Sequence, residues 1–151
     1  MQETLSHPKS TRVLERILAV LGTAICLVVS AGLWLAIHAQ QTIWPFPALY
    51  LLEMLAASGL GAWCLWNRPA GASGLRGILT WVAIGCQLGF VVLGVFSVGF
   101  AYLLPLGLLA SATILSDRRL GRSPFLHLGV GLAAVLAQAG LMLAVIQILY
   151  R

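Results

Sequence analysis

The chain has 151 residues, of which 60% are hydrophobic and 9% are charged, and its formal net charge is +5. Soluble domains average about 45–50% apolar and about 25% charged residues. A single domain of this length has too little interior to bury so many apolar side chains. The composition therefore excludes a soluble globular protein and predicts an integral membrane protein whose surface faces the lipid bilayer.

Apolar stretches long enough to cross a membrane divide the chain. A helix needs roughly 20 mostly apolar residues to span about 30 Å of hydrocarbon, where unpaired backbone amides are too costly. Three such stretches lie at 17–38, 46–66 and 124–149. Between the last two lies an uncharged run from 77 to 116, which is twice as long as one span. This run is either one very long helix or a hairpin of two.

The basic residues decide between these alternatives. If the run turns near Ser97-Val98-Gly99, eight of the nine basic residues share one side and only Arg151 lies opposite; the eight are Lys9, Arg12, Arg16, Arg68, Arg76, Arg118, Arg119 and Arg122. Lys and Arg accumulate on the cytoplasmic side of membrane proteins. We therefore predict an all-α, polytopic helical bundle with the N-terminus in the cytoplasm and the C-terminus outside. Its five transmembrane helices are expected at about 17–38, 46–66, 77–96, 100–116 and 124–149.

The polar N-terminus is the largest segment outside these spans. We expect 1–12 to form a loose cytoplasmic tail and 13–151 to form a single transmembrane domain. The apolar stretch at 17–38 exceeds the roughly 7–15 residues of a secretion-signal core, so it reads as a retained anchor. The location predicted is the cytoplasmic (plasma) membrane, and the eight-to-one preference for Arg over Lys suggests a bacterial source.

Three polar side chains interrupt the apolar spans at comparable depth. Glu53, Gln87 and Gln138 lie well inside the second, third and fifth spans, so these helices could meet around a polar centre. Because an acidic side chain in lipid is costly, Glu53 is expected to face the bundle interior or water. The centre is either a proton or solute site or an interhelical hydrogen-bond clamp, whose bonds contribute roughly 0.6 kcal/mol each.

Small residues in the third span indicate a close helix contact. Gly85 and Gly89 form a GxxxG pair, which permits close backbone packing within the monomer or between subunits. Gly107 with Ser111, and Ala133 with Ala137, have the same spacing.

Three arginines follow the fourth span. Arg118, Arg119 and Arg122, next to Asp117, are explained by the topology rule alone, or they could contact anionic lipid head groups or a cytoplasmic partner.

The remaining motifs give no sign of chemistry. Cys26, Cys64 and Cys86 lie in apolar runs without metal-ligand spacing and read as small buried hydrophobes. His38 and His127 are predicted at opposite faces, where they cannot ligate one haem or metal. The sequence contains no Ser-His-acid set, phosphate loop or HExxH pair. We expect no enzyme activity, no cofactor, no metal and no nucleic-acid partner.

Two functions fit these expectations. The first is a small non-enzymatic accessory, structural or assembly subunit of a larger membrane complex, with other membrane subunits or further copies of itself as partners. The alternative is a small oligomeric transporter or channel in which Glu53 is the intramembrane protonatable site. The absence of an internal repeat argues against a self-contained carrier.

Overall fold

The computed structural model describes residues 8–39, 46–67, 74–94 and 99–149. These residues form α1 (Pro8–His38), α2 (Phe46–Trp66), α3 (Gly74–Leu93), the short 3₁₀ helix η1 (Gly99–Tyr102), α4 (Leu103–Arg119) and α5 (Pro124–Leu149). Five segments, of which the fourth joins η1 to α4, are long and apolar enough to cross a membrane. The predicted all-α bundle of five helices is therefore confirmed.

The helix bounds agree closely with the hydropathy pattern. α2 and α5 have the predicted bounds, whereas α3 begins and ends three residues earlier than the predicted 77–96. The fourth segment extends from Gly99 to Arg119, beyond the predicted 100–116. Apolar length therefore predicts the position of these helices to within about three residues at each end.

The start of α1 differs from the prediction. The helix begins at Pro8, inside the segment expected to be a loose tail, and the first seven residues lie outside the described residues. Proline is well suited to the first turn of a helix. The added polar turns carry Glu15 and Arg16, whose side chains contact other helices. Tertiary contacts therefore extend the helix beyond its apolar stretch.

The uncharged middle run doubles back as predicted. Ser97 and Val98 lie outside the described residues, but the Gly99 amide donates a 2.7 Å hydrogen bond to the Gly94 carbonyl oxygen. A Cβ atom on Gly99 would lie 2.6 Å from the Gly94 carbonyl carbon, so only glycine fits this approach. The close approach brings the end of α3 against the beginning of η1 and α4.

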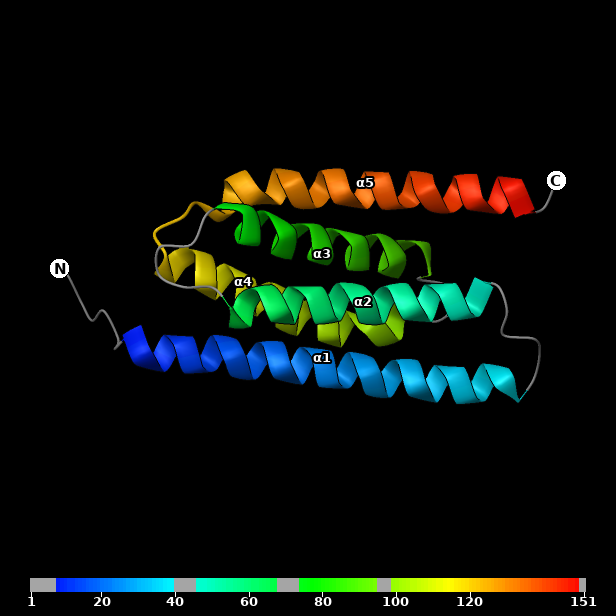
Figure 1. Ribbon diagram of the computed structural model, residues 1–151, viewed down its shortest axis with the longest axis horizontal. Helices are drawn as coiled ribbons and strands as arrows, with labels where there is room; N and C mark the ends of the chain where they lie inside the picture. Colours follow the sequence, from blue (N-terminus) through cyan, green and yellow to red (C-terminus); the bar gives the residue numbers. More distant parts are fainter. Residues whose placement is uncertain (1–7, 40–45, 68–73, 95–98, 150–151) are drawn as a thin grey trace.

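The helices alternate in direction, with α3 between α2 and α5 and with α1 at the opposite edge (Figure 1). Within the apolar 18-residue stretches, 56% of the residues in α3 are buried, against 6% in α5. α3 packs against α2, α4 and α5, whereas α1 packs against α2 and α4. The backbones of α2 and α5 do not meet in the described part of the chain. An outward-facing recess therefore separates these two helices over α3.

The alternating direction of the helices also places the described arginines at one end of the bundle. The beginnings of α1, α3 and α5 lie at the same end of the bundle as the ends of α2 and α4 (Figure 1). Arg12, Arg16, Arg76, Arg118 and Arg119 all belong to these terminal turns. We call this the arginine-rich end. The compartment that it faces remains a prediction.

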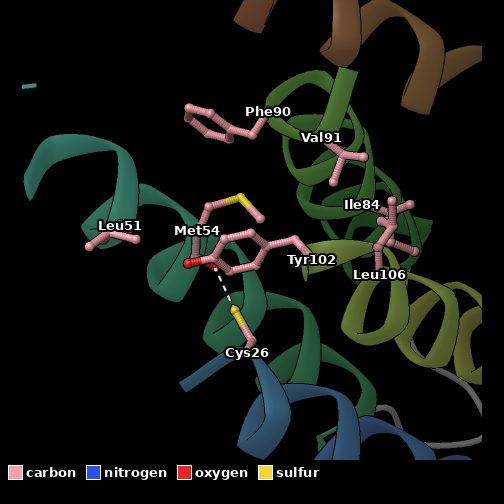
Figure 2. Packing of buried hydrophobic residues seen from close by; sticks show 8 residues of the cluster. All are labelled: Cys26, Leu51, Met54, Ile84, Phe90, Val91, Tyr102 and Leu106. Carbon is pink, nitrogen blue, oxygen red and sulfur yellow. Dashed lines mark hydrogen bonds between the residues drawn. The ribbon is translucent and has the colours of Figure 1, made fainter. Parts of the chain in front are cut away.

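A buried cluster joins the first four helices at the opposite half of the bundle. Figure 2 shows its eight members, which are Cys26, Leu51, Met54, Ile84, Phe90, Val91, Tyr102 and Leu106. Tyr102 is fully buried, and its hydroxyl shares a 2.8 Å hydrogen bond with that of Ser30 on α1. Tyr50 packs edge-on against Phe90, with ring centroids 4.9 Å apart. Aromatic rings and thioether fill the space between helices, and the polar tips find partners.

α5 rests on the small residues of α3. A Cβ atom on Gly85 would overlap the Gly131 carbonyl oxygen and lie 2.7 Å from the Ala134 Cβ. At Gly89 it would lie 3.3 Å from the Gln138 Cβ. The GxxxG pair therefore forms a contact within the monomer. Gly107, Ala133 and Ala137, in contrast, are exposed.

We predict that Gly85→Ala destabilises the protein, because the added methyl group pushes α5 away from α3. Overpacking of this kind costs about 1–3 kcal/mol. That loss should lower the midpoint of thermal unfolding in mild detergent by roughly 3–10 °C. Gly107→Ala is the matched control, since a Cβ there meets no atom within 4 Å. Equal midpoints for the two variants would contradict the packing.

Candidate functional site

Glu53 and Gln138 form a polar pair between α2 and α5. The Gln138 Nε2 donates a 3.1 Å hydrogen bond to the Glu53 Oε2. Glu53 follows the first residue of α2 by seven positions, or about 10 Å along the helix at 1.5 Å per residue. The pair therefore lies within the length of an apolar helix. This part of the expected polar centre is present in the structure.

The Glu53 side chain, which we expect to face the bundle interior or water, lies outside the core. Its side chain is exposed, whereas the neighbouring positions Leu51, Met54, Ser58 and Gly61 are buried and supply the inward face of α2. One residue corresponds to about 100° around a helix, so Glu53 is turned away from the core by its place beside Met54. The carboxylate points into the recess that separates α2 from α5.

The recess is a lateral groove. It has a cavity of about 70 Å³ lined by Leu49, Tyr50 and Glu53 of α2, Phe90 of α3, and Leu141, Met142 and Val145 of α5. The Tyr50 hydroxyl already donates a 3.3 Å hydrogen bond to the Phe90 carbonyl oxygen. Among the lining side chains, Glu53 is therefore the one that can accept further hydrogen bonds from a group bound in the groove. We refer to these seven residues as the lateral groove.

Gln87 does not belong to this pair. Gly89 faces Gln138, and Gln87 leaves α3 about 200° around the axis from it. Its side chain is 1% exposed, and neither its Nε2 nor its Oε1 has a hydrogen-bond partner in the described part of the chain. The predicted three-residue centre is therefore a lateral pair and a separate buried amide.

A buried ion pair lies at the arginine-rich end. The Arg119 Nε and Nη2 donate hydrogen bonds of 2.8 and 3.0 Å to the two carboxylate oxygens of Glu15. The side chains are 15% and 5% exposed, respectively. A two-point bond of this kind fixes the orientation of both groups. Arg119 therefore joins α4 to α1, and its charge is already compensated.

Asp117 joins three helices at the same end. This fully buried carboxylate of α4 accepts a 2.8 Å hydrogen bond from the Trp81 Nε1 of α3, and its Oδ2 lies 3.1 Å from the His127 Nδ1 of α5. Sequence reasoning missed this cluster. The available signal was an acid at the end of one span, with Trp81 and His127 each five residues after an arginine of a loop expected on the same side.

The other arginines have different surroundings. Arg16 lies over the Trp66 ring, 4.6 Å from its centroid, and Arg76 donates to the Asn67 carbonyl oxygen. Arg122 is half-buried, and its backbone amide donates to the Asp117 carbonyl oxygen. Arg118 is exposed. Of the three arginines considered for lipid or partner contact, Arg118 is thus the exposed one, and Arg119 and Arg122 are half-buried.

The described residues contain no group of three or more His, Cys, Asp or Glu side chains that could hold a metal ion. Cys26 and Cys64 are buried, Cys86 is half-buried, and all three are free thiols. Comparison of the chain with family models, curated proteins and solved structures finds no match. The lateral groove and the polar groups around it are therefore the features that bear on function.

We predict that Glu15→Ala destabilises the bundle, because the mostly buried Arg119 guanidinium loses its counter-charge. Removing one partner of a buried ion pair costs about 3–5 kcal/mol. The expected fall in unfolding midpoint in mild detergent is roughly 6–15 °C. Arg118→Ala should leave the midpoint unchanged, and Glu15→Ala combined with Arg119→Leu should recover part of the loss. A stable Glu15→Ala variant would show that the pair does not hold α1 to α4.

Proposed function

We propose that this chain is a small non-enzymatic protein of the bacterial plasma membrane that serves as an accessory or assembly subunit of a larger membrane complex. In this proposal the lateral groove receives a transmembrane helix of another subunit. The observation that carries the proposal is the exposed Glu53–Gln138 pair within an apolar lateral surface.

Lipid is a poor solvent for a carboxylate such as that of Glu53. A charged side chain near the centre of a membrane helix costs about 2.5–3.5 kcal/mol on insertion scales. Gln138 supplies one hydrogen bond to Glu53, but a carboxylate has about four acceptor sites. Lipid tails supply no donors. A helix with a hydroxyl, amide or cationic side chain at this depth would provide them.

The walls of the groove are suited to packing against a transmembrane helix of another subunit. Leu49 on one wall and Leu141 on the other are 38% and 53% exposed, so both present apolar surface to whatever fills the recess. Without a hydrophobic driving force in lipid, helices associate through packing and through polar contacts between them. The groove offers both, because apolar walls surround one acceptor.

The other acidic groups have structural partners. Glu15 binds Arg119, and Asp117 binds Trp81 and His127. These bonds connect α1, α3, α4 and α5, and they leave Glu53 as the acid suited to an intermolecular role among the described residues. We further propose that the arginine-rich end faces the cytoplasm, where Arg118 contacts anionic lipid head groups or a partner.

The alternative proposal is a small oligomeric transporter or channel with Glu53 as its protonatable site. Its support is the same exposed carboxylate beside a cavity. It requires a route for protons or solute from Glu53 to both membrane faces. The groove walls are mainly aliphatic and aromatic, and Gln87, the nearest candidate for a polar route through the core, lies apart from Glu53. The subunit proposal therefore has the stronger support.

The test is photo-crosslinking in intact membranes. A photoreactive amino acid at Leu141 in the groove should give one discrete heavier adduct, and Glu53→Leu should abolish it. Leu136, 74% exposed on another side of α5, is the matched control position and should give lipid adducts alone. Absence of a protein adduct at Leu141, or an adduct insensitive to Glu53→Leu, would contradict the subunit proposal. Loss of solute uptake by Glu53→Gln with the adduct intact would favour the transporter.

A further inference from the structure

Two guanidinium groups from different helices meet at the end of α2. The Arg16 Nη2 of α1 donates a 3.5 Å hydrogen bond to the Trp66 carbonyl oxygen. The Arg76 Nη1 of α3 donates to the carbonyl oxygen of the next residue, Asn67. Both arginines are half-buried. Consecutive carbonyl groups at the end of one helix therefore bring the two cations close to each other.

The carbonyl groups compensate only part of this positive charge. The carboxyl end of a helix carries about half a negative charge, against one full positive charge on each guanidinium. The nearby acids are already bound, since Glu15 accepts both hydrogen bonds from Arg119 and the buried Asp117 accepts from α3 and lies against His127 of α5. In the described part of the chain, no carboxylate forms an ion pair with either arginine at the end of α2. This end of α2 therefore keeps an excess of positive charge.

The two cations lie where the apolar part of α2 ends. The segment of α2 that is suited to crossing a membrane ends at Trp66, and the Arg16 guanidinium lies over the ring of that residue, 4.6 Å from its centroid. Trp63 and Trp66 are 55% and 50% exposed, and tryptophan is enriched at the level of the lipid head groups. One turn further along α2, Leu60 is exposed as well. Positive charge at the membrane boundary is thus next to apolar surface that an acyl chain can cover.

We propose that Arg16 and Arg76 bind the phosphate group of an anionic membrane lipid at the end of α2. A guanidinium presents its donors in a planar fork that matches two phosphate oxygens, and stacking on Trp66 orients the fork of Arg16. A zwitterionic lipid brings its own cation to the site, so a lipid with net negative charge is preferred. A soluble phosphate lacks the acyl chain that would contact Trp63 and Leu60.

This lipid site is separate from the lateral groove. Glu53 precedes Trp66 by thirteen positions, or about 20 Å along α2 at 1.5 Å per residue. The site also differs from the exposed Arg118 at the end of α4, because its two arginines are held by contacts with a third helix. The lipid proposal therefore does not depend on the proposed function, and failure of either would leave the other standing.

Native mass spectrometry of the full chain in mild detergent tests the site. The probes are phosphatidylglycerol and phosphatidylcholine with the same acyl chains, and the wild type should bind the first more tightly. Arg16→Gln and Arg76→Gln should each weaken phosphatidylglycerol binding about fivefold, which corresponds to one basic residue at an anionic membrane surface, and leave phosphatidylcholine binding unchanged. Arg12→Gln is the matched control, because Arg12 is exposed one turn earlier on α1.

The outcomes of this titration separate a site from diffuse charge. An equal loss of phosphatidylglycerol binding in Arg12→Gln would show that the net charge of the surface acts, and it would overturn the proposal. Equal binding of the two lipids by the wild type would do the same. Displacement of the lipid by millimolar glycerol phosphate would assign the site to a soluble phosphate instead, which also contradicts the proposal.

A density map of the wild-type protein in a phosphatidylglycerol nanodisc needs no variant to fold. The proposal predicts a phosphate peak within hydrogen-bond distance of both the Arg16 and the Arg76 guanidinium groups, with an acyl chain along Trp63. A map in which the two guanidinium groups contact only the end of α2, or an acidic side chain of another protein, would overturn it.

Discussion

The bundle depends on one constraint: hydrocarbon offers no hydrogen-bond partner, so each polar group within it must find one in the protein. The constraint explains the helices themselves and also the contacts at the arginine-rich end. There Glu15 and Arg119 satisfy each other, and Asp117 receives bonds from α3 and α5. The charged residues at the arginine-rich end thus stabilise the contacts between α1, α3, α4 and α5.

Two places depart from this rule, and they differ in kind. The Gln87 amide is enclosed in the core, and its two polar atoms have no hydrogen-bond partner among the described residues. Glu53 faces outward in the lateral groove, where we propose that a helix of another subunit supplies its further hydrogen bonds.

Sequence reasoning succeeded for features that depend on many residues at once, such as the length of an apolar stretch or the distribution of charge. Apolar length located all five helices, and the distribution of arginines predicted the hairpin whose two helices approach each other at Gly94 and Gly99. Sequence reasoning was less successful for the direction in which a single side chain points. Glu53 faces outward and Met54 inward because they differ by about 100° around the helix, and the pattern near Glu53 did not resolve that angle. The Asp117 cluster was missed because its members, on three helices, become neighbours through tertiary packing alone.

The central claim is that Glu53 holds this protein in an assembly. The most direct measurement is the mass of the particle extracted from native membranes in a lipid-retaining polymer, for the wild type and for Glu53→Leu. The account predicts a wild-type particle that contains protein beyond one 16.1 kDa chain, and a variant particle that contains one chain alone. A single chain in both samples would contradict the claim.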